Sequence, residues 1–174
     1  MKDKIRKLFL QKRNSLSIED VEEKSRKIIS KLKKDKDYIK AKTVMFYVSK
    51  EKEVNTQEII KEALKEKKVI VPKVIGKGIV CCELKEFDKM EFSCLGILEP
   101  KEVIKCDVSK IDLIIVPAVA FDKSSHRIGY GKGYYDELLK HAKAKKLGLA
   151  YDFQIVDKIP ADEWDVKVDK VITD

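Results

Sequence analysis

Residues 111–136 read IDLIIVPAVAFDKSSHRIGYGKGYYD. The first six of them form the most strand-like run in the chain, and Pro117 ends that run because proline has no N–H to donate to a sheet. A helix is predicted from Tyr134 to Ala144, directly after the last of three glycines. In open α/β sheets, ligands bind at the carboxyl ends of strands, and the first N–H groups of a helix attract phosphate. The order of strand, glycine-rich loop and helix therefore predicts an α/β fold with an anion-binding loop.

The flanking sequence extends this sheet. Further predicted strands are 43–48, 69–71, 79–84, 147–151 and 168–172. Further predicted helices are 4–13, 18–36 and 56–64. Ser17 and Thr56 are expected to be N-caps, the strand after Gly76-Lys77-Gly78 is expected to be antiparallel or at an edge, and residues 85–105 show little periodicity. We therefore expect a single Rossmann-like domain over residues 1–174, a three-layer α/β fold whose open, mostly parallel sheet carries helices on both faces.

Composition alone does not decide between classes of function. The chain has 174 residues and a formal charge of +8, from 38 Lys and Arg against 30 Asp and Glu. This excess attracts anions such as phosphates or nucleic acid, but a lysine-rich surface that only maintains solubility explains it equally well. The four cysteines form no Cys-x-x-Cys pair, so neither zinc binding nor thiol catalysis is expected.

The sequence predicts a cytoplasmic protein without a membrane partner. The N-terminus is charged from Lys2 onward, and no run approaches the roughly 20 apolar residues that span a bilayer.

The glycine-rich loop has the chemistry of a phosphate site. Gly129, Gly131 and Gly133 let the backbone approach a ligand, and Arg127 and Lys132 can donate charge-assisted hydrogen bonds to phosphate oxygens. The spacing matches neither the dinucleotide fingerprint nor the Walker loop, so the glycines alone also fit a flexible turn.

As a whole, however, the stretch resembles the signature of the 5-formyltetrahydrofolate cyclo-ligases, in which Pro-x-x-x-Phe-Asp precedes Arg-x-Gly-x-Gly-x-Gly-Tyr-Tyr-Asp. Matching segments elsewhere are Lys2-x-x-x-Arg6, Glu53-Val54-Asn55-Thr56, Gly96-Ile97-Leu98-Glu99-Pro100, and a C-terminal block with Gln154, Pro160 and 165–173. Ala118 and Asn55 stand where the family often has glycine and aspartate. Ala118 matters only if its φ is positive, and Asn55 keeps an acceptor.

The resemblance implies that 5-formyltetrahydrofolate and ATP become 5,10-methenyltetrahydrofolate, ADP and phosphate, with Mg²⁺ required. The formyl oxygen attacks the γ-phosphoryl group, N10 closes on the activated carbon, and phosphate departs. Such chemistry relies on positioning and charge neutralisation, which agrees with the lack of a catalytic triad.

The resemblance also assigns site residues. Catalysis falls to Lys132 and Arg127. The implied ATP-binding residues are Lys2, Arg6, Arg127, Ile128, Gly129, Tyr130, Gly131, Lys132, Gly133, Tyr134 and Tyr135. The implied folate-binding residues are Val48, Glu53, Tyr130, Gly131, Lys132, Gly133 and Tyr134. The implied Mg²⁺ ligands are Asp136 and Asp165.

Each assignment has a plainer alternative in the sequence. Lys2 and Arg6 fit a solvated helix face, Glu53 an exposed loop acid, and Asp136 a helix cap. Phe121 and Trp164 are expected in the core or a lid, and His126 in an exposed turn.

Two rival functions stay open. One is a small basic nucleic-acid-binding protein whose loop tyrosines stack on bases, and the other is a different ATP-dependent ligase or kinase on the same scaffold. Under the folate interpretation we expect a monomer that binds ATP and reduced folate but no nucleic acid, with surface lysines that favour polyglutamate tails.

Overall fold

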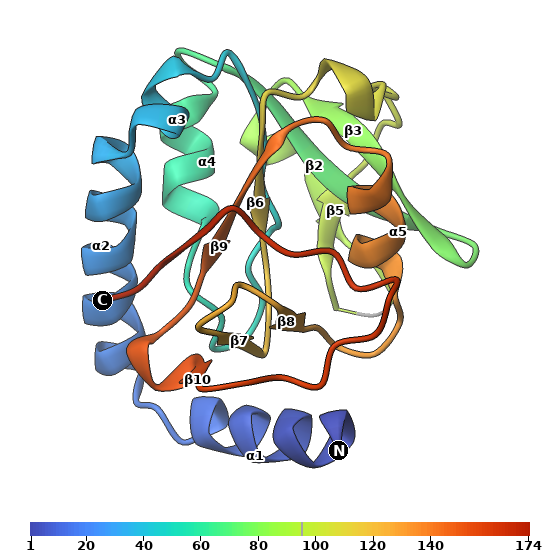
Figure 1. Ribbon diagram of the computed structural model, residues 1–174. Coiled ribbons are helices and arrows are strands. Elements are labelled where there is room, and N and C mark those ends of the chain that lie inside the picture. Colours follow the sequence, from blue (N-terminus) through green and yellow to red (C-terminus); the bar gives the residue numbers. More distant parts are fainter. Residues whose placement is uncertain (95) are drawn as a thin grey trace.

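A six-stranded sheet forms the centre of the computed structural model, which describes residues 1–94 and 96–174. The strands lie in the order β11-β9-β6-β1-β2-β3. Neighbours are parallel except β2 and β3, which form an antiparallel pair at one edge. Helices α2, α3 and α4 cover one face and α5 covers the other (Figure 1). The predicted open, mostly parallel sheet with helices on both faces is confirmed.

The helices are α1 (Lys2–Asn14), α2 (Ile18–Lys34), α3 (Lys36–Lys40), α4 (Gln57–Ala63) and α5 (Tyr134–Lys140). The sheet strands are β1 (Thr43–Met45), β2 (Lys68–Ile75), β3 (Gly78–Leu84), β6 (Leu113–Val116), β9 (Lys145–Leu149) and β11 (Lys170–Ile172). Smaller strands are β4 (Met90–Phe92), β5 (Leu98–Pro100), β7 (Ala120–Asp122), β8 (Arg127–Ile128) and β10 (Ile155–Val156). None of the described helices has the length and apolar character to cross a membrane.

Alternate residues of the central strands serve two cores. In β6, Leu113 and Ile115 pack with α2, α3 and α4, whereas Ile114 and Val116 pack with α5. All four side chains have no exposed area. A strand buried on both faces must be apolar at every position, which explains the unbroken run that marked β6 in the sequence.

The chain beyond β6 builds a platform at the carboxyl ends of the strands. There β7 pairs with β8 and β10 in a small second sheet, and α1 lies beneath it (Figure 1). Buried Asp122 fixes the turn between β7 and β8 by accepting hydrogen bonds from the N–H groups of Ser124, His126 and Ile159, each at 2.9 Å. The platform thus fixes the start of the glycine-rich loop, which follows β8.

The first predicted strand is shorter than expected. It was predicted over residues 43–48, but β1 ends at Met45. The Thr56 hydroxyl donates to the Tyr47 carbonyl at 2.7 Å and accepts from Ser49 N–H at 3.0 Å. Side-chain hydrogen bonds therefore replace the strand ladder here. Thr56 is the N-cap residue of α4, as predicted, but because its hydroxyl is used this way its side chain makes no capping hydrogen bond.

The boundaries of other elements also differ from those predicted. The helix predicted to Ala144 ends at Lys140, because β9 begins at Lys145, whose N–H donates to the Asp112 carbonyl at 3.0 Å. The segment 85–105, which had little periodicity, contains the antiparallel pair β4 and β5. By contrast, Ser17 caps α2 as predicted, accepting from Asp20 N–H at 3.0 Å.

Gly148 in β9 provides a test of the core. A Cβ at this position would lie 2.4 Å from Phe121 Cζ, and the Phe121 ring is fully buried and cannot turn away. We expect Gly148→Ala to lower the free energy of unfolding by roughly 1–3 kcal/mol through overpacking. This exceeds the gain of about 0.4–1 kcal/mol from a stiffer unfolded chain. Urea denaturation measures the difference.

The matched control is Gly78→Ala in β3, where an added Cβ would meet nothing within 4 Å. Its unfolding free energy should stay within about 0.5 kcal/mol of the original. Equal midpoints for the two variants would contradict the role given to Phe121.

Candidate functional site

A cleft of about 820 Å³ opens beside the glycine-rich loop, at the carboxyl ends of β1 and β6. Pro117 lines it directly after β6, and Val48 lines it just beyond β1. The β4–β5 hairpin contributes Leu98 and Glu99, and α1 contributes Lys2 and Arg6. Segments far apart in the sequence thus form one concave site, at the position where open α/β sheets bind ligands.

Every residue that the sequence singled out for binding lines this cleft. The set is Lys2, Arg6, Val48, Glu53, Arg127, Ile128, Gly129, Tyr130, Gly131, Lys132, Gly133, Tyr134, Tyr135, Asp136 and Asp165. The structure therefore brings the predicted site residues together, while their individual binding roles stay predictions.

Two of the loop glycines make room for arginines of the chain itself. A Cβ on Gly129 would lie 2.9 Å from Arg127 Nη1, and one on Gly131 would lie 3.4 Å from Arg6 Cζ. Gly131 also has a φ of 92°, which residues with a side chain rarely adopt. The glycines were expected to let a ligand approach. They also let two guanidinium groups cross the loop.

Arg127 is a buried cation that anchors the start of α5. Its Nη2 donates to Asp136 Oδ1 at 2.8 Å, and its guanidinium lies 5.8 Å from the centre of the Tyr135 ring. Arg127 Nε and Tyr135 Oη are buried without a hydrogen-bond partner among the described residues. Since buried polar groups are nearly always paired, these two atoms are available to a polar ligand.

Lys2 joins the N-terminus of the chain to its C-terminal segment. Its Nζ lies 2.5 Å from Asp162 Oδ2 and 2.5 Å from Asp165 Oδ2. Burial lowers the pKa of Lys2, but its hydrogen bonds to these carboxylates outweigh burial and raise that pKa. For Asp165, burial alone would raise the pKa, but the hydrogen bond from Lys2 outweighs burial and the pKa is lowered. Both groups are therefore ionised at neutral pH.

Arg6, one turn along α1, donates from Nε to the Gly129 carbonyl at 2.8 Å and also pairs with Asp3. Lys2 and Arg6 are thus part of the site and not the solvated helix face that composition alone suggested.

Glu53 is buried, with 7% of its surface exposed, and is not the exposed loop acid that the sequence also allowed. Its Oε1 accepts a hydrogen bond from the Tyr130 hydroxyl, and its Oε2 accepts one from Lys50 N–H at 2.9 Å. Burial raises the pKa of Glu53, while these hydrogen bonds and the charges of Arg13 and Lys50 oppose the rise. Glu53 is therefore a desolvated acidic side chain facing the cleft.

The remaining predicted site residues differ in whether their side chains or their backbone face the cleft. Lys132 is exposed, and its amine has no hydrogen bond or ion pair within the described part of the chain. The side chain of Ile128 is 1% exposed and packs with Phe9 and Val119, so this residue presents mainly backbone. Tyr134 and Val48 line the cleft as apolar walls.

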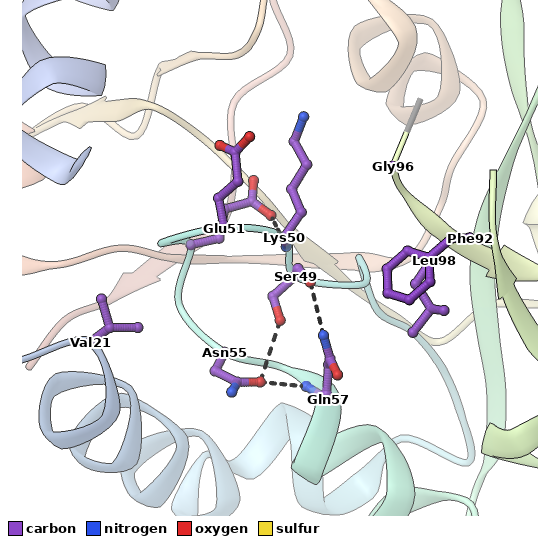
Figure 2. A pocket seen from close by; sticks show the side chains of 10 residues that line it. Val21, Ser49, Lys50, Glu51, Asn55, Gln57, Phe92, Gly96 and Leu98 are labelled. Carbon is purple, nitrogen blue, oxygen red and sulfur yellow. Dashed lines mark hydrogen bonds between the residues drawn. The ribbon is translucent and has the colours of Figure 1, made fainter. Parts of the chain in front are cut away.

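A side pocket of about 410 Å³ adjoins the cleft and shares Lys50, Glu53 and Leu98 with it. Its polar wall is the loop that follows β1 (Figure 2). There Asn55 Oδ1 accepts from Gln57 N–H at 2.9 Å and from the Ser49 hydroxyl at 3.4 Å. Asn55 thus acts as the acceptor expected of it, and Ala118 is not among the described residues with positive φ, so both departures from the family pattern are accommodated.

Sequence reasoning missed or misplaced several residues near the site. Arg13 of α1, only 1% exposed, was not singled out from the sequence. Asp162 was not singled out as a partner of Lys2. Of the two places expected for Trp164, the core is wrong, because this residue lies 61% exposed where it lines the cleft, whereas Phe121 is in the core. His126 lies against Asp122, 3.1 Å from Nδ1 to Oδ2, and does not line the cleft.

Comparison with known proteins gives this cleft a family. A family model for the 5-formyltetrahydrofolate cyclo-ligase family matches residues 1–174. The 5-formyltetrahydrofolate cyclo-ligase of Mycoplasma pneumoniae is 33% identical over 180 residues, covering 99% of this chain and 98% of that protein. The enzyme of that name from Escherichia coli is 28% identical over 175 residues, covering 95% and 96% of the two chains.

A solved structure agrees with these relatives. The NMR structure of Aquifex aeolicus 5,10-methenyltetrahydrofolate synthetase matches with a TM-score of 0.90 and 40% identity, covering 98% of this chain and 88% of that one. The resemblance drawn from the glycine-rich loop is confirmed. The protein is therefore a ligase of the 5-formyltetrahydrofolate cyclo-ligase family.

Proposed function

We propose that the protein converts 5-formyltetrahydrofolate and ATP to 5,10-methenyltetrahydrofolate, ADP and phosphate, with Mg²⁺ required. The observation that carries the proposal is the cleft itself. Lys2, Arg6 and Arg127 gather around the glycine-rich loop, and the same cavity holds the buried carboxylate of Glu53. A polyphosphate and a pterin ring need these two kinds of partner.

Phosphoryl transfer explains the choice of Lys132 as a catalytic residue. Lys2, Arg6 and Arg127 are already held by carboxylates, whereas Lys132, within the described residues, has no such partner. A long exposed side chain with a free ammonium can follow the γ-phosphoryl group as its charge is redistributed between the nucleotide and the formyl oxygen. Arg127, buried behind the loop, would hold the phosphates in place and so contribute by orientation.

The acidic residues fit a magnesium ion. Asp136 and Asp165 both line the cleft, and within the described chain Asp136 Oδ2 and Asp165 Oδ1 have no hydrogen bond. Mg²⁺ is commonly bound by one or two carboxylates together with phosphate oxygens. The two aspartates would hold the ion, which when bound neutralises charge on the triphosphate. No group of three or more metal-binding side chains occurs among the described residues, so the ion would depend on the nucleotide for further ligands.

Glu53 suits the pterin ring. An ionised carboxylate has about four acceptor positions, of which Tyr130 and Lys50 N–H occupy one on each oxygen. The pterin amino group and ring N–H form a pair of neighbouring donors that one carboxylate can accept together. Val48 and Tyr134 supply apolar walls in the same cleft.

The alternatives are less favoured by the same observations. The family assignment favours a folate substrate over nucleic acid and over another kinase or ligase reaction on this scaffold. Affinity for nucleic acid that falls steeply with salt, without product formation from folate, would reverse this preference. The monomeric state, the cytoplasmic location and the attraction of polyglutamate tails by surface lysines stay predictions; a folate KM insensitive to salt would count against the last.

The first test mixes purified protein, Mg²⁺ and 5-formyltetrahydrofolate with and without ATP, and follows the absorbance of the methenyl product. We expect an ATP-dependent rise. Lys132→Ala should lower kcat by roughly 100-fold, the usual effect of removing one donor to a developing charge. Asp136→Ala should lower the rate and raise the Mg²⁺ concentration needed for half-maximal activity.

Lys143→Ala is the matched control, because Lys143 is exposed and does not line the cleft. It should leave the rate unchanged. No absorbance change with the folded protein would sink the folate assignment.

Glu53→Gln tests pterin recognition. The amide keeps the size of the side chain but loses two acceptor positions and the charge, so the KM for 5-formyltetrahydrofolate should rise about 10- to 100-fold. The KM for ATP should change little, because none of the proposed phosphate contacts is lost. Glu58→Gln, an exposed substitution on α4, is the control. Equal increases in both KM values would argue that Glu53 only supports the fold of the cleft.

A further inference from the structure

Arg13 is the largest fully buried polar side chain of the described residues, yet it does not line the cleft. It lies on α1, and its Nη2 donates to the Tyr130 hydroxyl at 2.7 Å. The same hydroxyl donates to Glu53 Oε1. A continuous hydrogen-bonded chain therefore runs from Arg13 through Tyr130 to Glu53.

The donor capacity of arginine fixes the direction of this chain. A guanidinium can only donate, so the Tyr130 oxygen must accept from Arg13. The single hydroxyl hydrogen of Tyr130 is then directed to Glu53 Oε1. Arg13 thereby prevents Tyr130 from turning its hydrogen elsewhere, and the orientation of Glu53 Oε1 follows from that.

Two cations also contact the ring of Tyr130, which is 37% exposed. Arg13 Cζ lies 5.5 Å from the ring centre, and Lys50 Nζ lies 5.0 Å from it. Two cations in contact with one aromatic ring attract its electron-rich faces. Tyr130 is therefore fixed by both its ring and its oxygen.

Charge gives Arg13 a second effect on Glu53. The titratable groups that face Glu53 are Arg13 of α1, Tyr47 and Lys50 beside β1, Tyr130 of the glycine-rich loop, Tyr135 of α5 and Tyr151 after β9. The pKa values of all four tyrosines are raised, chiefly by burial, so these hydroxyls are neutral. Only Arg13 and Lys50 in this set carry the positive charge that opposes the burial-driven rise in the pKa of Glu53.

We infer that Arg13 is a positioning residue for reduced folate, acting through Tyr130 to hold the Glu53 carboxylate in place. This inference rests on the proposed function, because it takes Glu53 as the group that binds the pterin ring. Arg13 touches neither substrate. Its effect is expected in folate capture and not in the phosphoryl-transfer step.

The same helix also carries Lys2 and Arg6. Positions 2, 6 and 13 lie on one side of an α-helix, and Lys2 and Arg13 are separated by on the order of 16 Å along its axis. One helix thus places Lys2 against Asp165, Arg6 against the Gly129 carbonyl and Arg13 against Tyr130.

The test compares Arg13→Met, Arg13→Lys, Tyr130→Phe and the Arg13→Met/Tyr130→Phe double variant of the full chain. Arg13→Met should raise the KM for 5-formyltetrahydrofolate about tenfold, the effect of losing a charge-assisted hydrogen bond, with a much smaller change in the KM for ATP and in kcat. At a pH well above the acid limb, where the charge effect of Arg13 on ionisation is not felt, the double variant should be no worse than Tyr130→Phe alone, because the hydrogen bonds act in series. Lys12→Met, an exposed neighbour that loses the same charge, should behave like the original protein.

A pH profile separates positioning from general damage to the fold. Folate capture needs ionised Glu53, whose pKa burial already raises. Without the charge of Arg13 that pKa rises further, so the acid limb of kcat/KM for folate should move to higher pH in Arg13→Met. Arg13→Lys keeps the charge and should return the limb towards its original position.

Three results would overturn the inference. They are additive effects in the double variant, equal increases in the two KM values, and an acid limb that does not move. If Arg13→Met does not fold, the comparison of Arg13→Lys with Tyr130→Phe decides, since both keep a side chain of similar size.

Equilibrium dialysis of 5-formyltetrahydrofolate without ATP separates this inference from the proposed function. If the protein binds folate but does not turn it over, and Arg13→Met weakens that binding, only the proposed reaction is contradicted. If the protein does not bind folate, both the proposed function and this inference are overturned.

Discussion

A carboxylate removed from water is the constraint around which this site is built. Burying an ionised acid costs several kcal/mol unless hydrogen bonds and nearby cations compensate. Glu53 obtains them from three segments distant in sequence, namely its own loop, the glycine-rich loop and α1. The buried position of Glu53 is therefore stable only when all three segments are in place. This shared dependence explains why α1, which packs on the small sheet at the strand ends, is part of the site and not a peripheral addition.

The fold was predictable where one local rule decided the outcome. The apolar run at β6 requires burial on both faces, and the serine before α2 offers its oxygen to an exposed N–H group. Prediction failed where distant groups competed for the same atoms. Thr56 occupies the N-cap position of α4, but its hydroxyl is hydrogen-bonded to Tyr47 and Ser49 and not to the helix. The pairing of β4 with β5 and the small platform sheet depend on contacts that short strands do not reveal in their own periodicity.

The sequence predicted which residues line the cleft, but not how their side chains contact one another. The motif around the glycines located the cleft, and each residue it implied lies there. Charge patterns could not locate Arg13, because a buried arginine and a solvated one look alike within Lys12-Arg13. The helical spacing from Lys2 and Arg6 was the available signal, since it places position 13 on the same side of α1. Nor could the sequence indicate that Gly129 and Gly131 accommodate guanidinium groups, which needs the positions of side chains from other segments.

Trp164 gives the cleft an optical property of its own. It is the single tryptophan of the chain, and it stands in solvent at the wall of the cavity. Indole emission depends on the polarity around the ring, and this protein has no other indole in its core to dilute the signal. The tryptophan emission of the unmodified protein therefore reports on the surroundings of this wall of the cleft, and occupancy can be followed in real time without a dye or an introduced probe.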